Sequence, residues 1–275
     1  MDSITMLDGA MGTLLLRQGI ARSIPLEGLC LTDPQRITAI HRAYLTAGAQ
    51  ILYANTMGVN RLCLEHPECD AAHLIHAAVN CAKAALAGTN ARIAVSSGPC
   101  GTIPPAIRSA ACEAIVRAAE AAGADLLVFE TMIDKTEALC ALNIAKKHTA
   151  LPVFVTLTCD ASGRMPCGAY ADQTVSALEQ AGSDAVGLNC SLGPDRMLAV
   201  MESLAKRTAL PLVLKLSAGL PDPQTGEYPL SPEAYAHAVA PYLPLGISYL
   251  GGCCGTTPEY IKALASSYII NSVKE

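Results

Sequence analysis

The stretch YLGGCCGTTP (249–258) places two adjacent thiols, Cys253 and Cys254, between small residues. Successive side chains of a regular strand point to opposite faces, so both thiols can reach one site only if the backbone leaves the pleat there. Gly252 and Gly255 flank the pair, and glycine permits a sharp turn at little steric cost. We therefore expect the two sulfur atoms to converge on one point.

A third thiol, Cys190, stands in GLNCSLGP (187–194). Three protein ligands and one exchangeable position are typical of catalytic zinc, whereas structural zinc usually has four protein ligands. An all-sulfur ligand set also favours zinc over the hard cations Mg²⁺ and Ca²⁺. The pattern predicts a zinc site on Cys190, Cys253 and Cys254. Simple packing, or a disulfide between the two adjacent cysteines, is the competing interpretation of the same residues.

An open zinc site made of three thiolates is suited to thiol chemistry. A free thiol with a pKa of ~8.5 is mostly protonated at neutral pH, but a thiol that coordinates zinc is deprotonated. The resulting thiolate is a nucleophile for an electrophilic carbon. A hydrolase that activates water is the alternative, and we disfavour it because three thiolates donate enough charge to weaken zinc as a Lewis acid.

The elements that must position these thiols alternate regularly along the chain. Short apolar runs predict eight buried parallel strands, at 4–7, 50–55, 92–97, 125–130, 152–157, 184–189, 211–216 and 247–252. Amphipathic stretches lie between them, with clear helical spacing at 34–48, 71–88, 112–123 and 193–207. Eight such units in 275 residues predict a (β/α)8 TIM barrel that forms a single domain over residues 1–275. A doubly wound open sheet is the competing fold, but no switch point in strand order can be identified for it.

A weak internal repeat places polar and thiol residues at the ends of alternate predicted strands. The phrases AGAQILYANT (47–56), AGADLLVFET (122–131), AGSDAVGLNC (181–190) and LGISYLGGCC (245–254) align without gaps. Alternate strands of a barrel share side-chain layers, so Cys190 is expected opposite Cys254. Asn55, Glu130 and Asn189 are expected level with Cys253. All of these residues would lie at the carboxyl ends of strands, where barrel enzymes have their active sites.

Composition excludes several classes of partner. The net charge of −5 and the absence of a Lys/Arg run argue against nucleic acid and against a polybasic membrane patch. With no tryptophan and two phenylalanines, stacking on bases is also not expected. The amino terminus lacks the pattern of a signal peptide, and no run approaches the ~20 apolar residues of a membrane span, so we expect a cytoplasmic protein. Most of the twelve cysteines, such as Cys81, Cys112 and Cys140, are then expected to be small core residues.

The chain as a whole resembles the homocysteine S-methyltransferase family, and in particular the homocysteine-binding barrel of cobalamin-dependent methionine synthase. The pair GLNCSLGP and GGCCGTTP is the most specific part of this resemblance. The matching stretches are LDGAMGT (7–13), LTDPQRITAIHRAYLTAGAQILYANTMGVN (31–60), SSGPCGT (96–102), FET (129–131), GLNCSLGP (187–194) and GGCCGTTPEYI (251–261). The resemblance implies Zn²⁺ on the three cysteines and methyl transfer to the sulfur of homocysteine, which gives methionine.

The resemblance also implies where the substrate binds. Glu130 is expected to pair with the substrate ammonium, and it joins the three cysteines as a catalytic candidate. The turn after the first strand presents N–H groups that suit a carboxylate. The residues expected near the substrate are Asp8, Gly9, Ala10, Met11, Gly12, Thr13, Asn55, Glu130, Asn189, Ser191 and Ser217.

Two departures from the family pattern bear on substrate and donor. The seventh strand ends in KLSAG, with Ser217 where the family usually has asparagine, so one contact to substrate or to a water on zinc is expected to be lost or bridged. The chain also has no room for the folate, cobalamin and activation modules of the multidomain enzymes. The methyl donor is therefore expected from outside, as methylcobalamin or another methylcorrinoid on a separate protein, or as a sulfonium such as S-methylmethionine.

Two further hypotheses stay open at this point. The Ser217 departure is compatible with a small thiol other than homocysteine as the substrate. The chain could also be a non-catalytic thiol- or zinc-binding subunit of a larger methyltransferase complex.

Overall fold

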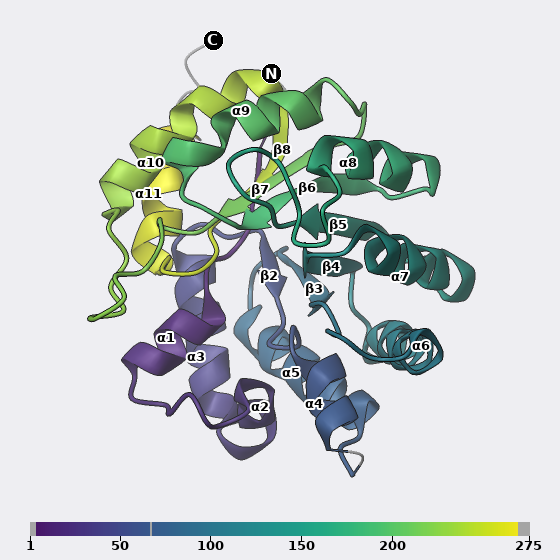
Figure 1. The fold of residues 1–275 in the computed structure, drawn as a ribbon. Helices are drawn as coiled ribbons and strands as arrows, with labels where there is room; N and C mark the ends of the chain where they lie inside the picture. The colour runs from purple at the N-terminus through teal and green to yellow at the C-terminus, as the bar shows by residue number, and fades with distance from the viewer. Residues whose placement is uncertain (1–3, 67, 269–275) are drawn as a thin grey trace.

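Eight parallel strands form the centre of the molecule and helices surround them, as Figure 1 shows. The structure is a computed structural model, which describes residues 4–66 and 68–268. The strands are β1 (Thr5–Met6), β2 (Ile51–Tyr53), β3 (Arg92–Ser97), β4 (Leu126–Met132), β5 (Val153–Leu157), β6 (Ala185–Cys190), β7 (Leu212–Leu216) and β8 (Ile247–Leu250). Each lies within a residue or two of a predicted run, so the eight predicted strands are confirmed.

The sheet closes on itself. Its strands follow the order β1-β8-β7-β6-β5-β4-β3-β2, and the two ends meet through a parallel bridge between Leu7 and Ile51. The Gln50 N–H also donates to the Met6 carbonyl across this seam at 2.7 Å. The fold is therefore the predicted (β/α)8 barrel, and the alternative of an open doubly wound sheet is wrong.

The helices form the outer layer. They are α1 (Met11–Arg17), η1 (Leu26–Gly28), α2 (Leu29–Thr32), α3 (Pro34–Thr46), α4 (Val59–Glu65), α5 (Ala71–Ala85), α6 (Pro105–Ala122), α7 (Lys135–His148), α8 (Ala171–Gln180), α9 (Pro194–Ala205), α10 (Pro232–Val239), η2 (Ala240–Leu245) and α11 (Pro258–Tyr268). The helix expected from residue 112 begins at Pro105, because proline is favoured in the first turn, where its missing N–H is not needed. No helix of the described residues is both long and apolar enough to cross a bilayer.

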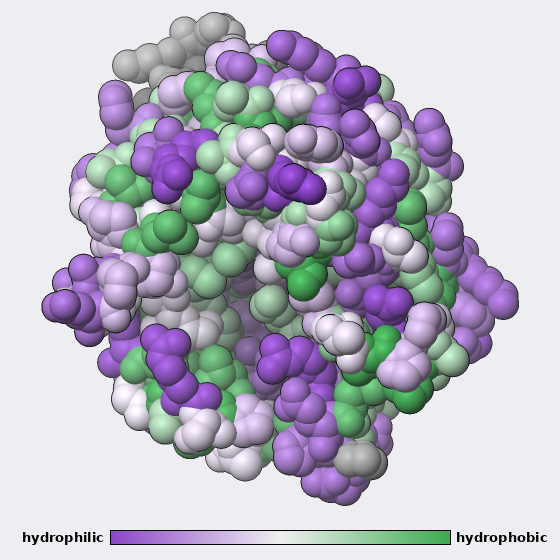
Figure 2. Space-filling model, in the orientation of Figure 1, coloured by the Kyte–Doolittle hydropathy of each residue, from purple (hydrophilic) through white to green (hydrophobic). Residues whose placement is uncertain are grey.

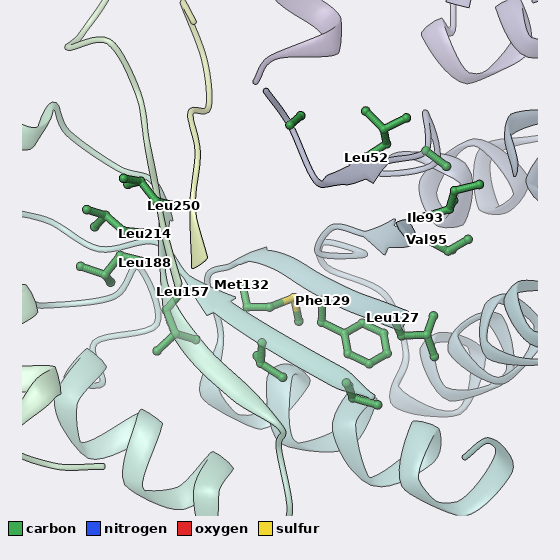
Figure 3. Close-up of a cluster of buried hydrophobic side chains, with 14 of the residues drawn as sticks. Leu52, Ile93, Val95, Leu127, Phe129, Met132, Leu157, Leu188, Leu214 and Leu250 are labelled. Atoms are coloured by element: carbon green, nitrogen blue, oxygen red, sulfur yellow. The ribbon is translucent and has the colours of Figure 1, made fainter. Parts of the chain in front are cut away.

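Two separate hydrophobic clusters hold the layers together. The larger one lies between the sheet and the helices, and Figure 3 shows its strand side chains, among them Leu127, Phe129 and Leu214. The smaller one fills the inside of the barrel and includes Tyr53, Phe154 and Val213. Because both faces of the strands are buried, the strand sequences are apolar runs with little polar alternation.

Cysteines on the helices behave mostly as core residues. Cys81 and Cys112 are buried, and Cys140 is half-buried. Four of the twelve cysteines are buried, so the expectation of small core residues is confirmed for Cys81 and Cys112 but not for most of the thiols.

Candidate metal and thiol site

Three sulfur atoms meet at the carboxyl ends of β6 and β8. The Sγ atoms of Cys190, Cys253 and Cys254 all lie within 4.8 Å of one another, and those of Cys190 and Cys254 are 3.9 Å apart. All three cysteines are free and half-buried, so no disulfide joins the adjacent pair. In Figure 1 the short helices α1, α2 and α4 lie below β6 and β8 in the view, and Figure 2 shows that the same face of the molecule is hollowed near its centre.

A tight turn brings the adjacent thiols to one side. The Thr256 N–H donates to the Cys253 carbonyl at 3.0 Å, and Gly255 in the third position of the turn has φ +85°. This is the geometry of a type II turn, which needs a positive φ at that position. The ring of Tyr228 lies so close that a Cβ on residue 255 would be 2.2 Å from it. The glycine is thus required both by the backbone and by the ring against it.

The third thiol is aimed by a left-handed stretch of backbone. Cys190 and Ser191 have φ of +55° and +53°, which is uncommon for residues with a side chain. The Ser191 hydroxyl lies 2.8 Å from the Thr158 hydroxyl and accepts the Cys159 N–H at 3.1 Å. The Ser191 N–H in turn donates to the Thr158 hydroxyl. These hydrogen bonds hold the strained conformation that turns the Cys190 sulfur toward the other two.

Without a metal, the three thiols are protonated at neutral pH. Hydrogen bonding to Cys253, and then burial, raise the pKa of Cys190 to about 12. The pKa of Cys254 is raised to about 11, first by hydrogen bonding to Cys190. For Cys253, hydrogen bonding to Cys190 would lower the pKa, but Cys254 and burial outweigh it and raise the pKa to about 12. Three thiolates at this spacing therefore need a cation.

The sulfur spacing fits such a cation. Zinc bonds to thiolates at about 2.3 Å in a tetrahedron, so two of its sulfur ligands lie about 3.8 Å apart. The 3.9 Å separation of the Cys190 and Cys254 sulfurs matches this value. The donor set is soft, and among the residues that the structure describes no fourth His, Cys, Asp or Glu joins the three cysteines.

Asn189 connects the thiols to Glu130. The Asn189 side-chain carbonyl accepts the Thr131 N–H and the Thr156 hydroxyl, both at 2.7 Å. Its amide nitrogen lies 3.4 Å from the Glu130 carboxylate and 4.0 Å from the Cys253 sulfur. The structure thus brings Asn189, Glu130 and Cys253 together, in the register that the repeat suggests. The side-chain amide of Asn189 is already engaged by these protein groups. Its role is therefore to hold Glu130 and Cys253 in position.

Glu130 is buried and its pKa is raised. Burial is the largest cause, while the charge of Lys215 and hydrogen bonding to Ser96 oppose it. The next residue, Thr131, has φ +59°, and it is held there by the hydrogen bond from its N–H to Asn189. Glu130 therefore presents its carboxylate from a strained strand end.

Asp8 lies deeper and already has protein partners. One carboxylate oxygen accepts the Tyr53 N–H at 2.7 Å, and the other is 3.0 Å from the Lys215 ammonium. Burial raises the pKa of Asp8, and Lys215 opposes that effect. Lys215 is a residue that the sequence analysis missed. The available signal was a lysine two positions after Val213 in an apolar run, which places its side chain on the inner face of the strand.

The other expected residues lie around this centre with varied roles. Ser217 is buried with its hydroxyl 3.7 Å from the Cys190 sulfur. The amide of Asn55 is turned away to the Leu26 carbonyl, at 2.7 Å, so it supports the segment after β1. Thr13 accepts the Gly255 N–H at 3.0 Å and so braces the turn that carries the thiol pair.

The start of α1 contributes backbone groups. A Cβ on Gly9 would lie 2.8 Å from the Tyr44 hydroxyl, so only glycine fits there, and Ala10 caps the helix without a side-chain hydrogen bond. The N–H groups of the first turn, which begins at Met11 and Gly12, have no side-chain cap of their own. Tyr228, at the mouth near Cys254, is a second residue that the sequence analysis missed.

Comparisons with known proteins agree with this geometry. The chain is 32% identical to the methionine synthases of Mycobacterium leprae (strain TN) and of Mycobacterium tuberculosis (strain ATCC 25618 / H37Rv), over 94% of this chain but only 24% of theirs. The homocysteine methyltransferase MmuM from Escherichia coli, in its oxidized form, shares the fold with a TM-score of 0.83 and 24% identity, over 96% of both chains.

A family model also matches the chain. The model described as homocysteine S-methyltransferase matches residues 5–268, which is nearly the whole chain and includes all three thiols. The predicted family is thereby confirmed: this chain belongs to the homocysteine S-methyltransferase family.

Proposed function

We propose that this chain is a zinc-dependent methyltransferase that transfers a methyl group to the sulfur of homocysteine and so forms methionine. The observation that carries the proposal is the convergence of three sulfur atoms within 4.8 Å at the mouth of the barrel. The family match over residues 5–268 supports the thiol substrate and the type of reaction.

Cys190, Cys253 and Cys254 would hold the ion. Bound there, Zn²⁺ would supply a fourth position at which a substrate thiol loses its proton at neutral pH. The protein's part is to fix the three sulfurs in advance, through the left-handed turn at Cys190 and the type II turn after Cys253. A structure of MmuM from Escherichia coli, which shares this fold, is described as its metallated form.

Glu130 would receive the ammonium of homocysteine. It is a buried carboxylate next to the thiols, and the Asn189 amide, which also donates to the Thr131 hydroxyl, contacts it. The N–H groups of the turn after β1, where α1 begins without a side-chain cap, would receive the carboxylate, because converging backbone N–H groups favour an anion. The two ends of the amino acid would then set how far its sulfur reaches toward the thiol site.

The reaction is a displacement at the methyl carbon. The sulfur of homocysteine forms a bond to that carbon, and the bond between the methyl group and the donor breaks. The electron pair of that bond leaves with the donor, which becomes a Co(I) corrinoid or, from a sulfonium, a thioether. The thiol proton passes to solvent before the attack, so the charges balance.

A corrinoid protein is the donor that the surface favours. Of the described residues, six large hydrophobic side chains are exposed, each in a segment between the end of a strand and the first turn of the barrel helix that follows: Ile24, Leu31, Met57, Ile107, Tyr170 and Leu220. Such segments all lie at the end of the barrel that carries the thiols. A small sulfonium needs no apolar rim, whereas a docking protein does.

The test is to supply purified, zinc-loaded protein with homocysteine and one donor at a time. Methylcobalamin, a methylated corrinoid protein and S-methylmethionine are the three donors, and methionine is measured by mass spectrometry. We expect methionine with the corrinoid donors and higher rates with the protein-bound one. Absence of methionine with every donor would contradict the enzymatic function, and product from S-methylmethionine alone would replace the donor assignment.

A further inference from the structure

A lysine lies inside the barrel, below the thiol site. Lys215 on β7 is 4% exposed, and its ammonium is 4.5 Å from the centre of the Tyr53 ring. Val213, two residues earlier, belongs to the cluster that fills the barrel interior. Because alternate residues of a strand point the same way, the lysine side chain enters that interior. A buried lysine without a function in the core is rare, since burial of a charge is costly.

Asp8 compensates this charge. Its carboxylate is 3.0 Å from the Lys215 ammonium, and both side chains are about as buried, at 4% and 5%. The other carboxylate oxygen of Asp8 is taken by the Tyr53 N–H. One oxygen thus accepts a hydrogen bond, and the other is in an ion pair with Lys215 without a hydrogen bond of its own, so the charge of Asp8 is already compensated within the protein.

Glu130 is a contrasting case in the same interior. It is 7% exposed, and no cationic side chain of the described residues lies within 4 Å of its carboxylate. The charge of Lys215 acts on Glu130 from a longer distance, but a buried carboxylate without an ion pair of its own is unfavourable unless a ligand supplies the cation. The Tyr53 hydroxyl is also buried with no hydrogen-bond partner, which indicates a second unsatisfied polar group in this interior.

We infer that Lys215 is a specificity-determining residue that leaves the interior able to accept a thiol with one ammonium group. By pairing with Asp8 it removes that carboxylate from ligand binding, so Glu130 alone receives the ammonium. Asp8, Lys215 and Glu130 together carry one net negative charge, which one ammonium neutralises. This inference rests on the proposed function and adds to it the charge that the substrate must carry.

Three thiols separate the contributions of the two ends of the substrate. Homocysteine carries both an ammonium and a carboxylate, 3-aminopropanethiol lacks the carboxylate, and 4-mercaptobutanoate lacks the ammonium. The affinity of each for the zinc-loaded protein is measured by calorimetry. The ratio of the affinities of the amine and the acid reports the charge that the interior accepts, and it cancels general losses of affinity.

Four variants that change the charges of this pair are then compared with the wild type. In Lys215→Met the interior gains a second uncompensated carboxylate, so the preference for the amine over the acid should rise about tenfold or more. In Asp8→Asn the lysine is left to compensate Glu130, so the same preference should fall by about tenfold. In the double variant D8N/K215M the pair is removed as a unit, and the ratio should return to within about threefold of the wild type. Lys215→Arg keeps the charge and should keep the ratio.

The outcomes distinguish this inference from the proposed function. If the zinc-loaded wild type binds none of the three thiols, the proposed function itself fails. If homocysteine binds but the single variants leave the ratio unchanged, or the double variant shifts it as much as a single one, the assignment of Lys215 is overturned. Should Lys215→Met not fold, Asp8→Asn and the double variant still decide the question, because the predicted shift and its cancellation are both measurable in them.

Discussion

Residues with positive φ occur at both ends of the barrel, but the two ends differ in the residue types that adopt it. At the amino-terminal end, where helices lead into strands, residues with positive φ are glycines, for example Gly123 at +72° and Gly246 at +80°. At the carboxyl end the described residues with positive φ that are not glycine are Thr131, Cys190 and Ser191. All three stand at the ends of strands that carry the candidate site.

This difference separates turns that only connect two elements from turns that position side chains of the candidate site. Glycine reaches a positive φ without steric cost, which is enough where the chain only has to turn. A residue with a side chain costs about 1–3 kcal/mol in that conformation and persists only if its surroundings hold it. At the carboxyl end the hydrogen bonds of Asn189 and of Ser191 do so. The strain is therefore tolerated where a side chain must point at the substrate.

The largest effect is expected from the thiols. Replacement of Cys254 by serine should remove most of the zinc from a protein that otherwise binds close to one equivalent, because two sulfurs and a weaker oxygen ligand remain. Activity should fall to background, while the stability of the metal-free protein changes by less than about 0.5 kcal/mol. Metal analysis by mass spectrometry and urea denaturation measure the two effects.

The control for this variant is Cys167→Ser, which changes an exposed thiol outside the three-sulfur cluster. It should keep both zinc and activity. Equal zinc content in the Cys254 variant and in the wild type would contradict the metal site.

Replacement of Glu130 is expected to have a smaller effect, which raises the stability of the protein but weakens substrate binding. Burial raises the pKa of its carboxyl above the ordinary value, so the fold favours the neutral form. The stability that protonated Glu130 contributes is thus lost as the pH rises through this raised pKa. Glu130→Gln stays neutral and should be more stable than the wild type by about 1 kcal/mol at pH 8, with a smaller gain at pH 5.

The same variant should bind homocysteine worse. Loss of the charged partner of the ammonium should raise KM roughly hundredfold. Urea denaturation at the two pH values and steady-state kinetics test both parts, and Glu202→Gln, at an exposed position on α9, is the matched control. Equal KM in both variants would mean that the ammonium binds elsewhere.

The smallest effect belongs to the other end of the barrel. Gly246 is exposed, and no atom lies within 4 Å of the place where a Cβ would stand. Alanine there should therefore cost about 1 kcal/mol of unfolding free energy through backbone strain alone and leave kcat/KM unchanged. Asparagine, which tolerates this conformation better, should cost less. A loss of activity in Gly246→Ala would erase the distinction between the two ends.

The fold was predictable because each strand leaves a local signal. Strands buried on both faces appear as apolar runs, and the eight runs coincide with the eight strands. Helix starts were less clear: α6 begins at Pro105, before its amphipathic pattern becomes evident at residue 112. The short helices α2 and α4 were not predicted, because segments of 4 and 7 residues contain too few turns for a periodic pattern.

The site was predictable only where alternate strands carry matching phrases. The shared layer placed Asn189, Glu130 and Cys253 together, and the structure brings them together. The same reasoning also placed Asn55 there, but its amide turns to the Leu26 carbonyl in a loop that no strand pattern describes. The Lys215–Asp8 pair joins β7 to the segment after β1, and these strands are separated by β8. Such a contact follows from the closed barrel and not from any spacing along the chain.

The brace between Thr13 and Gly255 ties the thiol pair to the first helix of the chain. Two of the three sulfur atoms thus belong to the last strand–helix connection, and their turn is held by a side chain from the first one. A polypeptide synthesised only as far as β7 would carry one sulfur of the three and no completed cage. At the proposed zinc site, loading of the ion would for this reason be a late event in biogenesis, and it would report that the first and last units have joined.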